Sequence, residues 1–179
     1  GFERLLLGSV TEKVVRTTTC PVITVPPPSV ATSRLPFKRV LCAVDYSEPS
    51  MAGLRLAVSM AKESDSTLTL LHVVEFPPET ESFTTLPFDM AAYRSAVQRD
   101  ASARLTELVT EDVKLWCHPV MKVASGKPHE EILAAAAEAR SDLIVLGVHG
   151  RNLMDMMLFG STTNQVIRRA ACPVLTVRH

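Results

Sequence analysis

Residues 142–151 read Asp-Leu-Ile-Val-Leu-Gly-Val-His-Gly-Arg, which is a run of four apolar residues followed by two glycines three positions apart. A short uninterrupted apolar run, bounded by a charged residue and a glycine, is typical of a strand that is covered on both faces. A parallel sheet between two layers of helices gives such cover. This stretch therefore predicts a strand of an α/β sheet that ends in a glycine-containing loop.

The alternation of strand and helix continues on both sides of this strand. Further apolar runs predict strands over 40–44, 67–74, 115–123 and 173–177. The segments between them predict helices over 51–60, 90–109, 128–139 and 160–171. Because the apolar runs show no alternation with polar residues, both faces of each strand need cover. We expect residues 38–179 to form one complete α/β unit, with a doubly wound, five-stranded and mainly parallel sheet.

A segment near the N-terminus repeats near the C-terminus without a gap. Residues 8–25 align with residues 160–177, and ten of the eighteen positions are identical. Each copy predicts a helix that opens at Gly-Ser, then a Cys-Pro break and a short buried strand. The second copy ends the complete unit. We therefore interpret residues 1–25 as the last helix and strand of a preceding, incomplete unit.

Residues 26–37 contain three consecutive prolines and several small polar residues, a composition typical of an extended linker. The apolar strand predicted at Pro21–Val25 lacks a sheet of its own, and an unpaired strand edge favours aggregation. We expect this strand to pair with the edge strand Pro173–Val177, either in the same chain or in a partner.

Composition excludes several classes of protein. The 179 residues include 19 basic and 19 acidic side chains, which disfavours nucleic acid as a partner, because duplex binding relies on clustered Lys and Arg. Every apolar run is far shorter than the roughly 20 residues of a membrane-spanning helix. We expect a soluble, cytoplasmic protein without a membrane partner. The 4 cysteines form no Cys-x-x-Cys pair, so they predict buried free thiols rather than disulfides or a zinc site.

The loop after the strand at 143–146 carries the most specific chemical signal. Gly147 and Gly150 are followed, nine residues later, by Gly160, Ser161 and Thr162 at a predicted helix start. Glycine lets a ligand approach the backbone closely. A helix start offers unpaired N–H groups, and a hydroxyl adds a donor, so these parts can hold phosphates without a cluster of basic residues. The spacing alone leaves an alternative, a turn glycine and a helix cap without any ligand.

Two strand ends of the predicted sheet place candidate ligand-binding residues at the same edge. Ligands of open parallel sheets bind at the carboxyl ends of strands, where the strand order reverses. Asp45 follows the first strand and Gly147 ends the fourth, and this unit would reverse between these two strands. Asp45 has an alternative role as a turn or helix-cap residue. His149 has the alternative of a solvated loop histidine, because no Ser or Cys lies near it in the sequence.

Together, several segments resemble the universal stress protein family, and they span the unit from about residue 38 to 177. They are Val44–Glu48, Leu71–Val74, Gly126–Ile132, Gly147–Arg151 with Gly160-Ser161, and Cys172–Val174. The resemblance implies a Rossmann-like, adenine nucleotide alpha hydrolase-like fold with strand order 3-2-1-4-5 and dimerisation through the last strand. It also implies a tandem protein, whose first domain ends with residues 1–25. In one branch of the family it implies ATP binding at the glycine loop, which this sequence keeps whole.

The same resemblance implies roles for individual residues. Ala43, Val44 and Asp45 would line the base pocket, with Asp45 facing the ribose or base, and the backbone of Val73 would meet the adenine edge. The other predicted cofactor-binding residues would hold phosphates and ribose or lie along the loop: Leu146, Gly147, His149, Gly150, Arg151, Gly160, Ser161 and Thr162.

Three functions stay open. The first is a stress-response protein that binds ATP or a related adenine nucleotide such as AMP, with Mg²⁺ accompanying ATP, and that acts by binding and homodimerisation. The second is an interaction module with an idle pocket. The apolar residues between Met154 and Phe159 favour it, unless they cover the core beneath the loop. The third is a slow ATP hydrolase, for which only Asp45 and His149 are candidates. We assign no catalytic and no metal-binding residue.

Overall fold

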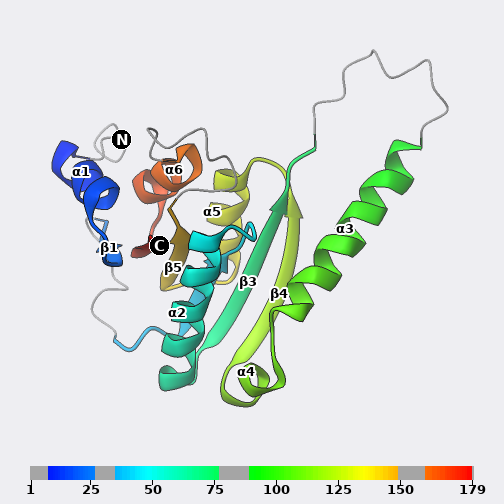
Figure 1. The fold of residues 1–179 in the computed structure, drawn as a ribbon, viewed down its shortest axis with the longest axis horizontal. Helices are drawn as coiled ribbons and strands as arrows, with labels where there is room; N and C mark the ends of the chain where they lie inside the picture. Colours follow the sequence, from blue (N-terminus) through cyan, green and yellow to red (C-terminus); the bar gives the residue numbers. More distant parts are fainter. Residues whose placement is uncertain (1–7, 27–34, 77–88, 149–159, 179) are drawn as a thin grey trace, which may run out of the picture.

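A computed structural model describes residues 8–26, 35–76, 89–148 and 160–178 (Figure 1). Six strands form one sheet in the order β1-β6-β5-β2-β3-β4. The strands are β1 (Val22–Thr24), β2 (Arg39–Ala43), β3 (Thr67–Val74), β4 (His118–Ser125), β5 (Leu143–Gly147) and β6 (Val174–Val177). All neighbouring strands are parallel except β1, which is antiparallel to β6. The predicted order 3-2-1-4-5 of the complete unit is confirmed, and β1 adds a sixth strand.

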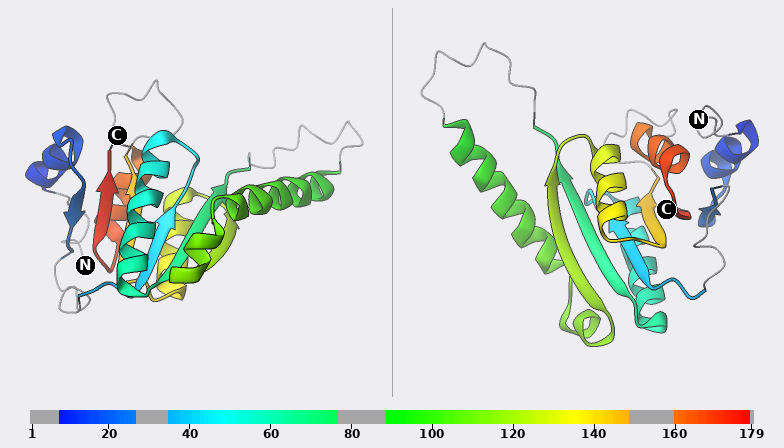
Figure 2. Two further views of the ribbon diagram at one scale, coloured as in Figure 1. Left: turned by 60° about the horizontal axis from the view of Figure 1, so that its bottom comes forward. Right: turned by 180° about the vertical axis from the view of Figure 1, so that it is seen from behind.

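Helices cover both faces of the sheet, as the doubly wound prediction requires (Figure 2). They are α1 (Ser9–Thr17), α2 (Glu48–Ser64), α3 (Met90–Glu107), α4 (Glu111–Trp116), α5 (Pro128–Glu138) and α6 (Ser161–Arg169). Buried side chains of α2, α3 and α4 form one core with the sheet, and those of α1, α5 and α6 form the other. Among the described helices, none has the length and apolar character needed to cross a membrane.

The two cores explain why the central strands β2 and β5 are almost entirely apolar. Successive side chains of a strand point to opposite faces. In β2, Val40 and Cys42 therefore enter the core under α2, whereas Leu41 enters the core under α5 and α6. All three are at most 1% exposed. Arg39, at the start of β2, is exposed, whereas burial of both faces leaves no place at positions 40–42 where a polar side chain would meet water.

The strand predicted at 115–123 is wrong at its start, because Leu115 belongs to helix α4 and β4 begins at His118. Helical spacing turns Val113 inward, where it is 7% exposed, and leaves Leu115 79% exposed. The exposed Lys114 ammonium contacts the Glu111 carboxylate at 2.7 Å on the outer side of this short helix. The sequence prediction counted Leu115 as a buried strand residue, which its helical position excludes.

The thiol prediction holds for three of the four cysteines. Cys42, Cys117 and Cys172 are buried, whereas Cys20 is exposed. Cys20 occupies the same place in its repeat copy as Cys172 does in the second copy. The second copy packs within a complete unit. The described part of the first copy consists of α1 and β1, and β1 has a neighbouring strand, β6, on one side only. The prediction that Cys20 is buried is therefore wrong.

The N-terminal arm, which we define as α1 and β1, is paired to the edge of the complete unit. Val22 lies opposite Thr176, Ile23 opposite Leu175 and Thr24 opposite Val174. This confirms the predicted strand pairing, in its intrachain form. The repeat aligns Val22 with Val174, Ile23 with Leu175 and Thr24 with Thr176. The two copies thus pair symmetrically, as if related by a twofold axis between Ile23 and Leu175.

Hydrogen bonds repeat this symmetry. The Thr24 hydroxyl donates to the Val174 carbonyl at 3.2 Å, and the Thr176 hydroxyl donates to the Val22 carbonyl at 3.2 Å. Burial does not repeat it, because Leu175 is 3% exposed and Ile23 is 47% exposed. The arm therefore shares one edge with the complete unit and presents apolar side chains on its outer side.

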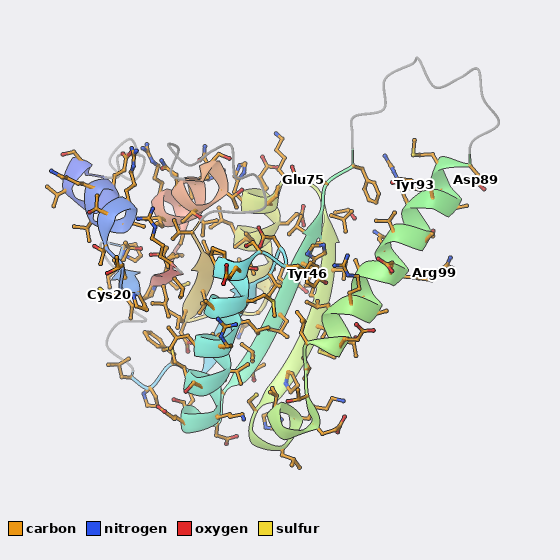
Figure 3. All side chains as sticks on the ribbon, in the orientation of Figure 1. Cys20, Tyr46, Glu75, Asp89, Tyr93 and Arg99 are labelled. Atoms are coloured by element: carbon orange, nitrogen blue, oxygen red, sulfur yellow. The ribbon has the colours of Figure 1, made fainter. Side chains whose placement is uncertain are left out.

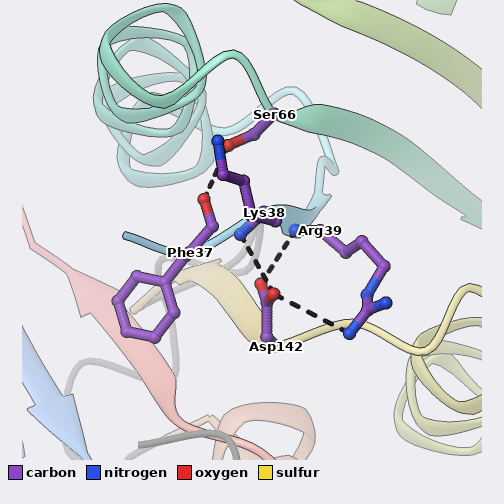
Figure 4. Close-up of polar contacts among 5 residues, drawn as sticks. All are labelled: Phe37, Lys38, Arg39, Ser66 and Asp142. Carbon is purple, nitrogen blue, oxygen red and sulfur yellow. Dashed lines mark hydrogen bonds and ion pairs between the residues drawn. The ribbon is translucent and has the colours of Figure 1, made fainter. Parts of the chain in front are cut away.

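The start of β2 is fixed at the opposite end of the sheet from the predicted site (Figure 4). The Asp142 carboxylate accepts hydrogen bonds from the backbone N–H groups of Lys38, at 3.0 Å, and Arg39, at 2.9 Å. The Ser66 hydroxyl, which is fully buried, donates to the Phe37 carbonyl at 2.6 Å. These bonds tie the first residues of β2 to the segments before β5 and β3, so the three strands enter the sheet in a fixed register.

Candidate functional site

The carboxyl ends of β2 and β5 lie side by side in the sheet, and the chain leaves them in opposite directions. After β2 it runs to α2 on one face, and after β5 the next described helix, α6, lies on the other face. This is the reversal point at which parallel α/β sheets bind ligands. Ser50 joins the two strand ends, because its hydroxyl accepts from the Asp45 N–H at 3.4 Å and its backbone lies against Gly147. The sequence prediction missed Ser50.

Asp45 closes the turn that starts α2. Its Oδ1 accepts hydrogen bonds from the Ser47 N–H at 3.0 Å and from the Ser47 hydroxyl at 2.5 Å. Ser47 is the N-cap of α2, and its Oγ accepts from the Ser50 N–H at 3.4 Å. The alternative role of Asp45 as a turn residue is thus present in the structure. It uses one carboxylate oxygen, and within the described residues Oδ2 takes no hydrogen bond.

Three of the predicted cofactor-binding residues share the face covered by α5 and α6. Ala43 and Val73 are half-buried there, and Leu146 is buried in the same core. Val44 points the other way, into the core under α2, and is 3% exposed. Its side chain therefore does not line the predicted pocket, because a strand turns successive residues to opposite faces.

The backbone of Val73 extends past the end of β2. In a parallel sheet, alternate residues of a central strand direct their N–H and C=O groups to the same neighbouring strand. The Leu71 carbonyl accepts from the Val44 N–H at 2.8 Å, so Leu71 faces β2. Val73, two residues further on, faces the same side, beyond Ala43, the last residue of β2. A donor and an acceptor thus point into the space next to the half-buried Ala43.

Gly147 is required by the packing of the fold. A Cβ atom at this position would lie 2.4 Å from the Ser50 nitrogen and 2.6 Å from the Pro49 carbonyl carbon. Both are backbone atoms in the first turn of α2, and no side-chain rotation could relieve these contacts. The close approach of α2 to the end of β5 therefore explains this glycine without a ligand.

Gly160 has no such explanation. It is the N-cap of α6, with φ of −47° and ψ of 130°, which any residue can adopt. Among the atoms of the described residues, a Cβ atom there would meet the Thr163 Oγ1, at an ordinary 3.8 Å. Ser161 is exposed and Thr162 half-buried, and the first turn of α6 contains no acidic residue. Within the described part of the chain, this helix start has no acidic residue and no capping side chain, so its N–H groups are suited to an anion.

Other parts of the predicted site fall outside the described residues. These are His149, Gly150, Arg151 and the apolar cluster between Met154 and Phe159. Among the described residues, no group of three or more His, Cys, Asp or Glu side chains could hold a metal ion.

Comparison with known proteins agrees with the fold and with the repeat. The family model of the universal stress protein family matches residues 1–26 and 36–178. Protein Rv2005c from Mycobacterium tuberculosis, named a universal stress protein, is 30% identical over 186 aligned positions. That alignment covers 99% of this chain and 58% of the relative.

Solved structures show the same fold. The structure of MJ0577 from Methanocaldococcus jannaschii has a TM-score of 0.68 at 25% identity, and the match covers 79% of this chain and 96% of that one. A universal stress protein solved in complex with cAMP has a TM-score of 0.52 at 22% identity, covering 79% and 97% of the two chains, a likeness in fold alone. From the family match over nearly its whole described length, this chain belongs to the universal stress protein family.

Proposed function

We propose that this chain is a cytoplasmic stress-response protein that binds ATP or a related adenine nucleotide, such as AMP, at the carboxyl ends of β2, β3 and β5. The observation that carries the proposal is the early end of β2 at Ala43, which leaves the backbone of Val73 without a ladder partner in β2 at the reversal point of the sheet. Adenine offers a donor and an acceptor on one edge, and a strand backbone offers the complement.

The remaining groups suit the rest of a nucleotide. Oδ2 of Asp45, which takes no hydrogen bond from the residues that the structure describes, suits ribose hydroxyls as an acceptor. The N–H groups at the start of α6 and the hydroxyls of Ser161 and Thr162 suit phosphate oxygens. Mg²⁺ would accompany ATP on its phosphates, and we assign no residue to it. A universal stress protein of the same fold was solved with cAMP, which is also an adenine nucleotide.

Binding measurements on a matched pair of variants test the proposal. We expect saturable binding of ATP by isothermal titration calorimetry, loss of binding in Gly160→Trp, and no change in Gly8→Trp. Gly8 holds the same place in the first repeat copy, and a Cβ there would meet nothing within 4 Å. Absence of binding at millimolar ATP, AMP and cAMP would refute the proposal and leave an interaction module with an idle pocket.

We also propose the tandem organisation implied by the repeat: residues 1–25 end a preceding universal stress protein unit, residues 26–37 link the units, and residues 38–179 form the complete domain. The separate family matches at 1–26 and 36–178 support it. So does the apolar outer side of the arm, where Val14 is 41% and Ile23 is 47% exposed. In this chain β1 takes the edge of β6, so we propose that the arm makes within the chain the contact that a homodimer would make.

We propose binding rather than turnover as the activity. Hydrolysis of ATP requires a positioned base, a nucleophile or a metal site, and we assign no residue to these roles. Phosphate release above a protein-free blank, abolished by Asp45→Ala, would identify a slow hydrolase instead.

A further inference from the structure

Tyr46 has an unusual backbone conformation next to Asp45. Its φ is 64°, in the left-handed region that residues other than Gly, Asn and Asp seldom adopt. A large aromatic residue keeps such a conformation only where its surroundings hold it. The contacts of the Tyr46 ring must therefore compensate for the strained backbone.

The ring of Tyr46 lies between two side chains from different elements. Its centroid is 4.8 Å from that of the His72 ring on β3, and the Arg104 guanidinium on α3 lies 4.4 Å from it. The Tyr46 hydroxyl donates to the Ala101 carbonyl of α3 at 3.5 Å. Figure 3 shows Tyr46 at the side of the sheet covered by α3, whereas the half-buried Ala43 and Val73 belong to the opposite face.

These contacts fix the backbone on both sides of Asp45. Before it, the Val44 carbonyl accepts from His72 Nδ1 at 2.7 Å, which requires the proton on that nitrogen. After it, Tyr46 sets the direction in which the chain reaches Ser47, whose N–H and hydroxyl bind Asp45 Oδ1. Release of the Tyr46 ring would free the peptide groups on either side and, with them, the Asp45 side chain.

We infer that Tyr46, held by His72 and Arg104, is a positioning residue for the Asp45 carboxylate, and that helix α3 thereby sets the affinity of the nucleotide site on the opposite face of the sheet. The inference rests on the proposed function for the identity of the ligand. The geometry of the turn stands without it. If the contacts of the Tyr46 ring only held α3 against the sheet, loss of the ring would leave the orientation of Asp45 unchanged.

Four variants separate these roles. Tyr46→Asn removes the ring and keeps a residue type that tolerates the left-handed region, and Tyr46→Phe keeps the ring. Arg104→Ala removes the cation above the ring, and Arg99→Ala removes an exposed arginine of the same helix as its matched control. Thermal unfolding of each variant shows whether it folds.

The first readout is hydrogen exchange of the Ser47 amide without nucleotide, since this amide donates to Asp45. We expect exchange to accelerate by about tenfold in Tyr46→Asn and about threefold in Arg104→Ala, and to stay unchanged in Tyr46→Phe and Arg99→Ala. Unchanged Ser47 exchange in both Tyr46→Asn and Arg104→Ala would overturn the positioning role, whether or not the protein binds nucleotide.

The second readout is the dissociation constant for ATP, which we expect to rise by about five- to tenfold in Tyr46→Asn and less in Arg104→Ala. Faster Ser47 exchange with an unchanged ATP affinity would overturn the link between α3 and the site. Absence of ATP binding by the unmodified chain would refute the proposed function, and Ser47 exchange would still decide whether Tyr46 positions Asp45.

Discussion

Replacing each of two glycines by alanine separates what the fold needs from what a ligand needs. At Gly147, the added Cβ would lie 2.4 Å from the Ser50 nitrogen, while ordinary contacts begin at 3.4 Å. The first turn of α2 therefore has to move by about 1 Å, because 3.4 minus 2.4 is 1.0 and the clashing atoms are backbone. At Gly160, the nearest atom of the described residues is 3.8 Å away, an ordinary contact that requires no described atom to move.

These distances give the size of the two effects. Overpacking costs about 1–3 kcal/mol, and a rigid backbone neighbour places Gly147→Ala near the upper end. A change of about 3 kcal/mol lowers Tm by about 6–12 °C in a protein of this size. Gly160→Ala exchanges one N-cap residue for a poorer one, which costs less than about 1 kcal/mol, and so less than about 4 °C.

Differential scanning calorimetry of both variants, with urea unfolding as a second measure, tests this contrast. We expect Gly147→Ala to be less stable than the parent chain, because its added Cβ disrupts the contact between α2 and β5. Gly160→Ala should be almost as stable as the parent chain. The reasoning is refuted if Gly147→Ala is as stable as the parent, or if the two variants lose equal stability. Any effect of Gly160→Ala should appear in ATP affinity rather than in Tm.

Three further outcomes are expected. At about pH 8 a thiol reagent should modify the exposed Cys20 and spare Cys42, because burial raises the pKa of the Cys42 thiol to about 12 and keeps it protonated; equal labelling of both before denaturation would contradict the burial. Thr24→Val and Thr176→Val should each weaken the arm by about 1 kcal/mol, measured by hydrogen exchange of β1, since each removes one of two equivalent bonds; an effect from one variant alone would exclude symmetric pairing. Asp142→Ala should lower the free energy of unfolding in urea by about 2 kcal/mol, because two backbone N–H groups lose a charged acceptor; a neutral result would show that water replaces the carboxylate without loss.

The fold could be predicted from the sequence because its central strands β2 and β5 are buried on both faces. The run at 143–146 is entirely apolar, and so is 40–44, which only a sheet between two helical layers explains. The repeat then predicted the partner of β1. Helix α4 could not be predicted in this way, because the sequence alone does not show that the apolar side chain of Val113 is buried and that of Leu115 is exposed.

The candidate site was predictable in its position and less so in its details. The strand order predicts that Asp45 and Gly147 lie at one edge, since that is where the chain reverses. The packing reason for Gly147 depends on how closely α2 approaches β5, and that distance is set by long-range contacts. The same holds for Tyr46, whose backbone conformation depends on His72 and Arg104 from two other elements.

The symmetric pairing of β1 with β6 has a thermodynamic consequence. Two separate molecules that meet through such an edge are joined only in proportion to their concentration, and dilution parts them. Here β1 and β6 belong to the same chain, so their pairing is an intramolecular step with an effective concentration that does not depend on how many molecules are present. The fraction of molecules in which β1 covers the edge of β6 is therefore expected to be the same at every level of expression.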